Sequence, residues 1–204
     1  KKSDKRTLAF GAVSIDISSL GSTPPEVVRV LDAAGVRQIS PVVDVTNFIN
    51  LTVGQPLHAF DADKIKLPLY IRPATRGEKI TTLNGKTNLL TPDDLVVADA
   101  NGPVDIAGVM GGADTEVSKT TTKVVLIASV IEAMSIRKTA QRHGIRTDAS
   151  ARYERGIPVE LLNRGRALAI ELLESMGAKV GAGARLGEVE SPKTIVEVKP
   201  EQIN

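Results

Sequence analysis

The sequence predicts a mixed α/β domain built in layers, in which strands outnumber helices. Short runs rich in β-branched residues fill residues 68–131, whereas helical patterns occur near 25–34, 135–144 and 159–176. Of the 204 residues, 42% are hydrophobic and 25% are charged, which is typical of globular proteins and excludes disorder. Aromatic residues make up only 2%, so the core must be aliphatic and a base-stacking surface is not expected.

The first third of the chain begins with an expected strand over residues 8–17, which are enriched in β-branched side chains. A helix should follow from Thr23-Pro24-Pro25, because proline fits a first helical turn, and should end at Gly35. The next segment, 41–61, is apolar and β-prone but contains a glycine and a proline. We therefore expect a loop or bend over 54–61.

The strand-rich middle contains Asn84-Gly85, which predicts a hairpin with a two-residue turn in which both residues take positive φ. The same glycine begins a Gly-Lys-Thr triplet that resembles part of a nucleotide-binding loop. That loop needs a glycine where this chain has Ile80, so a hairpin is the preferred interpretation.

The last third should contain a helix over 135–144, with a serine cap and a terminal glycine, followed by a polar stretch. The clearest helix spans 159–176. Its predicted apolar stripe consists of Leu161, Gly165, Leu168, Leu172 and Met176. Four glycines between 177 and 187 indicate a loose exit, and a last strand is expected near 194–199.

The net charge of +2 hides a local asymmetry. Residues 137–166 hold eight basic and three acidic side chains, which gives this window a charge of +5 and leaves −3 for the remainder. Such a basic window indicates contact with a polyanion such as RNA, although a solvated helix face would have the same composition.

Several classes of protein are disfavoured by what the sequence lacks. Without cysteine there is no disulfide framework, zinc–thiolate site or cysteine nucleophile. No apolar run is long enough to span a membrane and no signal peptide opens the chain, so a cytoplasmic protein without membrane contact is expected. Because the sequence starts at Lys1, we expect a fragment of a longer chain.

The two histidines are the side chains that titrate nearest neutrality. His143 lies at a helix end, where an imidazole can satisfy carbonyl groups, whereas His58 lies in a segment that proline and glycine interrupt. Neither has a second ligand at a suitable spacing, so no metal site is predicted. Ser150 lies outside any nucleophile-elbow motif, and the glycine group 107–112 indicates either a tight turn or a wall approached by a ligand.

Three segments together resemble a known family. They are PVVDVTNFINLTVGQPLHAFD (41–61), IAGVMGG (106–112) and SIRKTAQRHGIRTDASARYERG (135–156). They are similar to the central editing module of the bacterial phenylalanyl-tRNA synthetase beta chain, and the resemblance extends from about residue 8 to 180.

The resemblance implies a three-layer β/β/α sandwich in which residues 1–190 form one editing module of two intertwined subdomains and 191–204 begin the next domain. It implies hydrolysis of tyrosyl-tRNA(Phe), because an apolar synthetic site rejects an added hydroxyl only about a hundredfold. Its expected partners are phenylalanine tRNA and the synthetase alpha chain. ATP and Mg²⁺ serve the parent enzyme, and the module itself should need no cofactor.

The resemblance also assigns site residues. His58 would orient the attacking water or hold the terminal ribose, and Thr147 would shape the water site. Separately from the resemblance, the basic window 137–166 leads us to expect that Arg142 and Arg146 contact tRNA. The remaining expected substrate-binding residues are Thr46, Asn47, Pro56, Gly108, Gly111, Ile127 and Ala149.

Ile127 departs from the family pattern, which has a glutamate there that bonds the tyrosine hydroxyl. The change is explained by natural degeneration, by an engineered substitution, or by transfer of the role to Glu132 or Asp148. The alternative function is therefore a degenerate, non-editing tRNA-binding or scaffold module.

Overall fold

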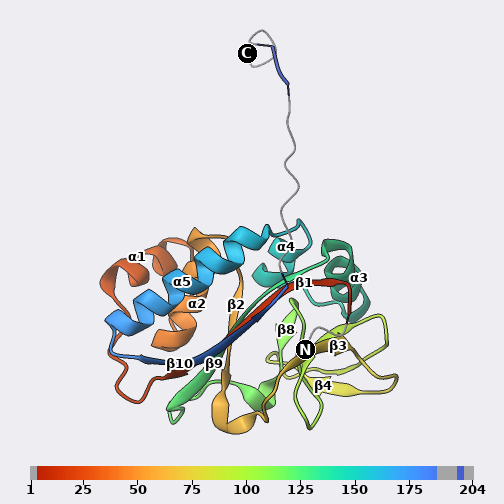
Figure 1. Cartoon of the computed structure of the whole chain (residues 1–204), viewed down its shortest axis with the longest axis horizontal. Coiled ribbons are helices and arrows are strands. Elements are labelled where there is room, and N and C mark those ends of the chain that lie inside the picture. Colours follow the sequence, from red (N-terminus) through yellow and green to blue (C-terminus); the bar gives the residue numbers. More distant parts are fainter. Residues whose placement is uncertain (1–3, 188–196, 200–204) are drawn as a thin grey trace.

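The computed structural model describes residues 4–187 and 197–199, which form layers of helices and antiparallel sheets (Figure 1). Two short 3₁₀ turns, Ala62–Lys64 and Ala113–Thr115, connect strands. In chain order the helices and strands are β1 (Thr7–Asp16), α1 (Pro25–Ala33), α2 (Pro41–Thr52), β2 (Leu57–Asp61), β3 (Tyr70–Pro73), β4 (Lys79–Thr81), β5 (Thr87–Leu89), β6 (Leu95–Ala98), β7 (Pro103–Ile106), β8 (Met110–Gly111), β9 (Lys123–Ile131), α3 (Ala133–His143), α4 (Asp148–Tyr153), α5 (Val159–Ser175) and β10 (Lys179–Leu186).

The predicted three-layer β/β/α arrangement is confirmed. The first sheet has the order β10-β1-β9-β2, and the second has the order β3-β6-β7-β8, with β4 and β5 forming a separate hairpin. Helices α1, α2 and α5 lie together on one side of the first sheet (Figure 1). The second sheet packs on its other side, so the first sheet is the middle layer.

Strand β9 supplies apolar side chains to both faces of this middle layer. Val124 and Leu126 belong to the core shared with α2 and α5, whereas Val125 and Ile127 belong to the core between the two sheets. This alternation follows from the two-residue period of a strand. Because both faces are covered, β9 is apolar without alternation from Val124 to Ala128.

The expectation that segment 41–61 is β-prone up to a loop over 54–61 is wrong in both parts. Residues 41–52 form helix α2, whose N-cap Ser40 accepts a hydrogen bond from the backbone N–H of Val43, with Pro41 in the first turn. The bend is confined to 53–56, and residues 57–61 pair with β9 as an edge strand. Burial against the sheet outweighs the β-propensity of valine, isoleucine and threonine here.

The Asn84-Gly85 hairpin is confirmed, but its turn is of another type. Gly85 has φ of 78°, while no residue other than glycine has positive φ in the described part of the chain. The backbone N–H of Thr82 donates to the carbonyl of Lys86, and that of Gly85 donates to the carbonyl of Thr82. This is a three-residue loop with a glycine bulge and not the predicted two-residue turn.

The helices of the last third are confirmed with altered boundaries. Helix α3 has Glu132 and not a serine as its N-cap, and it ends as predicted at Gly144, which has φ of 62°. The polar stretch that follows contains the short helix α4, which the sequence analysis missed. Helix α5 is present, but its buried face is rotated about the helix axis relative to the predicted stripe. The buried residues are Val159, Leu162, Gly165, Ala169 and Leu173.

The glycine-rich exit predicted after α5 is instead strand β10, which pairs antiparallel with β1. Its glycines suit that position, since a Cβ on Gly181 would lie 2.5 Å from the Ser14 hydroxyl oxygen. The strand predicted near 194–199 and the domain start predicted over 191–204 lie outside the described residues, apart from 197–199, which form no strand.

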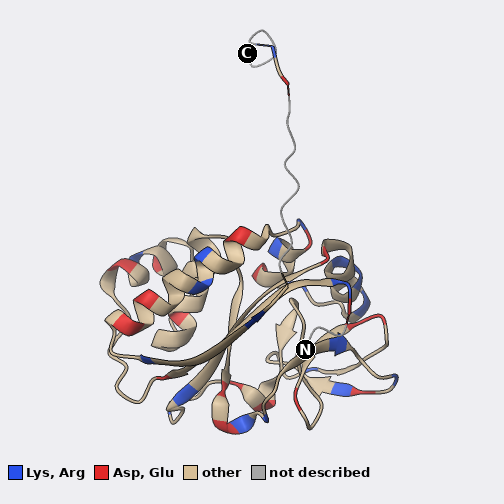
Figure 2. Ribbon diagram, viewed as in Figure 1, with Lys and Arg blue, Asp and Glu red and all other residues tan. Residues whose placement is uncertain are grey.

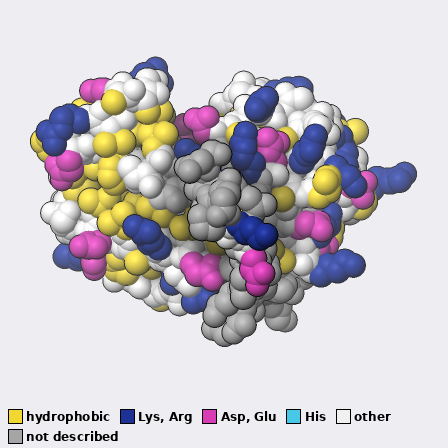
Figure 3. All heavy atoms as spheres, turned by 90° about the horizontal axis from the view of Figure 1, so that it is seen from above, with side chains coloured by type: hydrophobic (Ala, Val, Ile, Leu, Met, Phe, Trp, Pro, Cys, Tyr) yellow, Lys and Arg dark blue, Asp and Glu magenta, His cyan; other side chains and the backbone are white. Residues whose placement is uncertain are grey.

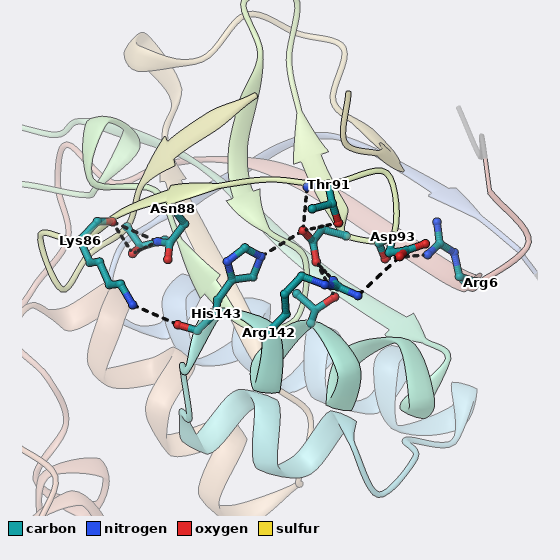
Figure 4. A network of polar contacts seen from close by, with 10 residues as sticks. Arg6, Lys86, Asn88, Thr91, Asp93, Arg142 and His143 are labelled. Atoms are coloured by element: carbon teal, nitrogen blue, oxygen red, sulfur yellow. Dashed lines mark hydrogen bonds and ion pairs between the residues drawn. The ribbon is translucent and has the colours of Figure 1, made fainter. Parts of the chain in front are cut away.

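A buried polar cluster attaches α3 to the second sheet (Figure 4). Asp94 is fully buried and bonds to Arg142, to His143 Nε2 at 3.0 Å and to the Thr91 backbone N–H at 2.9 Å. Burial alone would raise the pKa of Asp94, but the Thr91 N–H and His143 outweigh it and hold the pKa below its usual value. His143 therefore serves the fold, as the structural interpretation of this residue proposed.

Replacing Asp94 should destabilise the protein. Asp94→Asn should lower the free energy of unfolding by on the order of 3 kcal/mol at pH 7, because it leaves buried partners unpaired. The depressed pKa means that this contribution is present above about pH 4 and is lost as the pH falls further. Urea unfolding measures it, with Asp93→Asn as the control, since the Asp93 side chain is 83% exposed. Equal losses in both variants would contradict the prediction.

Candidate active site

A pocket with a volume of about 80 Å³ lies between the two sheets. Its walls include two rows of residues on facing strands. One row crosses the second sheet through Val97, Asp105 and Gly111, which are direct cross-strand partners. The other row crosses the first sheet through the paired residues His58 and Ile127.

His58 lies at the centre of the pocket. Its Nε2 is buried and has no hydrogen-bond partner among the described residues, although the residue as a whole is only partly buried. Its ring meets that of Phe60 edge to face, with centroids 4.6 Å apart. Burial lowers the pKa of His58 to about 4, so the imidazole is neutral at physiological pH and can accept or donate one hydrogen bond.

Gly111 allows the imidazole to lie directly against the second sheet. A Cβ on Gly111 would lie 2.6 Å from His58 Cε1 and 2.8 Å from Nε2, distances that the ring could not tolerate. The glycine is therefore required by close approach and not by its backbone angles. Any larger residue at 111 would therefore move the imidazole.

Asp105 is a lining residue that the sequence analysis missed. It is 6% exposed, and its Oδ1 has no hydrogen-bond partner among the described residues. Burial raises the pKa of Asp105 to about 7, so a carboxyl group that is ordinarily charged is partly protonated near neutrality. A single aspartate within the apolar run 103–109 was the available signal, because the alternation of the strand places it among buried neighbours.

The phenol of Tyr153 closes one side of the pocket with all its hydrogen bonds made within the chain. Its hydroxyl contacts Ser129 Oγ at 3.0 Å and the Ser129 carbonyl at 3.1 Å, and the Gln55 amide donates to it at 3.4 Å. Burial raises the pKa of Tyr153 to about 12. Tyr153 thus forms part of the pocket wall, and hydrogen bonds to residues of β9 and of the bend before β2 fix its position.

Gly108 lines the pocket in a different manner from the one expected. Its φ is 72°, and a Cβ there would lie 2.8 Å from Ile136 Cδ1 and 3.1 Å from the Tyr153 ring. The space beside it is therefore filled by the chain's own side chains and is not kept open for a ligand. The tight-turn interpretation of residues 107–112 describes this position better.

Thr147 positions the site without lining it. Its hydroxyl donates to the Val109 carbonyl at 2.8 Å and accepts from the Ser150 N–H at 3.0 Å, which caps helix α4. The glycine turn and α4 are thereby joined, and Ala149 of α4 reaches the pocket together with Pro56. The Thr147 hydroxyl is already engaged in two hydrogen bonds, so its contribution is to hold the wall.

Thr46 and Asn47 do not line the pocket. Both lie on α2, and the Thr46 hydroxyl donates to the Val43 carbonyl at 2.7 Å within that helix. Of the two acidic residues proposed to replace the glutamate at position 127, neither Glu132 nor Asp148 lines the pocket, and both are exposed. The carboxyl group that does line it belongs to Asp105.

The basic window forms a surface groove between α3 and α4, on the half of the molecule where Lys and Arg side chains project at several places (Figure 3). Figure 2 shows the basic residues of α3, which carries no acidic residue. Arg137, Arg146 and Arg155 line the groove. Arg142, which we expected to contact tRNA, is instead bound to Asp94, so Arg146 is the stronger candidate.

Neither a metal cluster nor a membrane-spanning helix is found in the described ranges. No group of three acidic or histidine side chains there could hold an ion. No helix in these ranges is long and apolar enough to cross a bilayer.

Residues 5–178 match the B3/4 domain family, and the chain therefore belongs to that family. It is similar to the phenylalanine–tRNA ligase beta subunit of several bacteria. It is 43% identical to the Moorella thermoacetica protein over 188 residues, which are 91% of this chain and 23% of that protein. It is also 43% identical to the Geobacter sulfurreducens protein over 167 residues, 81% of this chain and 21% of the relative.

The chain thus spans about a fifth to a quarter of the length of these relatives. Among solved structures, it resembles an N-terminal fragment of the phenylalanyl-tRNA synthetase beta subunit from Pyrococcus horikoshii. The TM-score is 0.53 at 16% identity, and the match covers 84% of this chain and 46% of that fragment. At this identity the similarity concerns the fold.

The buried carboxyl group should make stability depend on pH. Because the pKa of Asp105 is raised in the folded protein, its protonation contributes to the free energy of unfolding. This contribution is fully present below about pH 4 and is lost as the pH rises through about 7. Asp105→Asn should therefore raise the free energy of unfolding at pH 8 by on the order of 3 kcal/mol, and the gain should vanish near pH 4. Urea unfolding at both pH values measures it, and a gain that does not change with pH would contradict the prediction.

Proposed function

We propose that this chain is the editing module of a phenylalanine–tRNA ligase beta subunit and that it hydrolyses tyrosyl-tRNA(Phe). The observation that carries the proposal is His58 Nε2, a buried polar atom without a described partner in the pocket between the two sheets. Similarity to ligase beta subunits supplies the substrate class. Phenylalanine tRNA and a ligase alpha subunit are the proposed partners, with ATP and Mg²⁺ serving the synthetic reaction elsewhere in the parent enzyme.

In the proposed reaction, water attacks the carbonyl carbon of the ester that joins tyrosine to the terminal ribose. A tetrahedral intermediate forms, the bond to the ribose oxygen breaks, and that oxygen takes a proton while tyrosine leaves as the free amino acid. Neutral His58 can accept a hydrogen bond from the attacking water, which places it against the ester. The ester is already activated, so positioning is the main requirement.

A second candidate function is a scaffold that has lost editing. The specific observation in its favour is Ile127, which lies beside His58 and can form no hydrogen bond with a hydroxyl group. If this candidate is correct, the parent ligase will not hydrolyse tyrosyl-tRNA, and Ile127→Glu should create activity where none existed.

Removing the imidazole should abolish most of the hydrolysis. In the complete ligase, His58→Ala should slow deacylation of preformed tyrosyl-tRNA(Phe) by about 100-fold, because the positioned water is lost. Gly111→Ala should slow it in the same direction while keeping the histidine, because the new methyl group displaces the ring. Phenylalanine charging by the same preparations is the control for intact enzyme. Equal deacylation by wild type and His58→Ala would remove His58 from the mechanism.

The arginine groove is the proposed contact with the tRNA backbone. Arg146→Ala should weaken tRNA binding by the complete ligase and reduce the slope of log affinity against log salt by about 1, as loss of one phosphate contact does. Arg29→Ala is the matched control, because Arg29 is an exposed arginine on α1 in the helical layer. Filter binding over a range of salt concentrations measures both, and identical slopes for the two variants would indicate a merely solvated face.

A further inference from the structure

Asp105 is the polar group of the pocket that the proposed hydrolysis leaves without a role. The residue is more than nine-tenths buried, and its Oδ1 has no hydrogen-bond partner in the described part of the chain. Burying a carboxyl group unpaired is costly, and its bonding capacity is regained when a ligand supplies the partner. It is the one acidic residue among those that line the pocket in the described structure.

The strand register directs the Asp105 side chain into the pocket. Asp105 lies between Val97 and Gly111 as their direct cross-strand partner, and such partners project from the same face of a sheet. The Cβ direction of Gly111 points into the His58 ring. The carboxyl group of Asp105 and the imidazole of His58 therefore both face the pocket between the two sheets.

No hydroxyl in residues 4–187 or 197–199 forms a hydrogen bond with Asp105 Oδ1. The nearby Tyr153 hydroxyl is within hydrogen-bonding distance of the Ser129 hydroxyl, of two backbone carbonyls and of the Gln55 amide, but not of Asp105. Apart from His58, Ser129 and Tyr153, the other side chains that line the pocket are apolar, including Val97, Val109 and Ile127. The pocket is therefore mostly apolar, with His58 Nε2 and Asp105 Oδ1 as polar atoms that have no described partner, which suits an apolar ligand with a polar end.

We propose that Asp105 is a specificity-determining residue, which forms a hydrogen bond with the phenolic hydroxyl of a tyrosyl side chain held in this pocket. This inference rests on the proposed function. The phenol suits the site better than the α-ammonium group, because the phenol lies at the far end of the side chain from the ester, whereas the ammonium lies next to the ester carbonyl and the ribose. A phenylalanyl side chain would leave the carboxyl group buried and unpaired, so the pocket disfavours it.

The decisive measurement is the ratio of kcat/KM for hydrolysis of tyrosyl-tRNA(Phe) to that for phenylalanyl-tRNA(Phe), with the complete ligase. Asp105→Leu, which is apolar and of similar size, should lower this ratio about 10- to 100-fold by slowing only the tyrosyl reaction. Asp105→Asn should retain most of the ratio, because an amide also bonds a phenol. A purely structural role would slow both esters equally, and that result, or an unchanged ratio in Asp105→Leu, would overturn the inference.

Binding of the free amino acids separates this inference from the proposed hydrolysis. The wild-type ligase, with its synthetic site blocked by a phenylalanyl-adenylate analogue, is titrated with tyrosine and with phenylalanine and observed by NMR. Preference for tyrosine, lost in Asp105→Leu and kept in the control Asp63→Leu on an exposed turn, supports the inference even when no ester is hydrolysed. In that case only the proposed function fails. Absence of any preference for tyrosine in the wild type overturns the inference.

Discussion

The site depends on the packing of β9 between two layers. Because β9 pairs with β1 on one side and β2 on the other, it determines where His58 lies, opposite Ile127. Leu126, which precedes Ile127 in β9, belongs to the core shared with the helices. A shift of the β9 register by one residue would therefore exchange the side chains on the two faces of the strand. A slipped strand would therefore turn Ile127 out of the pocket and bury the wrong side chain there. The apolar cores on both sides fix the register, and the register fixes the site.

Stability and the proposed chemistry are in conflict at the centre of the molecule. His58 Nε2 and Asp105 Oδ1 are both buried without described partners, although filling the pocket with apolar side chains would be more favourable for folding. The Tyr153 hydroxyl and the Thr147 hydroxyl beside them are both hydrogen-bonded within the chain. Two unpaired polar groups that face the same pocket are typical of a site that binds a ligand.

Sequence patterns predicted the layers, the hairpin and the long helix α5, since apolar periodicity is local information. They misassigned residues 41–52, where propensity favoured a strand and the Ser40-Pro41 cap signal was overlooked. Of the residues that the family resemblance indicated, Pro56, His58 and Gly111 line one pocket. Thr46, which it also indicated, lies on α2 and does not line that pocket. Asp105 was missed because only the pairing of three strands shows that its side chain faces the histidine.

Strand β10 gives the middle sheet its outer boundary. All its residues are exposed, and it pairs with β1 along one side, while its other side carries backbone groups free to accept a further strand. Shortening the chain to residue 178 would remove β10 and uncover β1 in its place. Since β1 carries buried apolar residues such as Phe10 and Val13, its bare edge would invite pairing with other copies and aggregation.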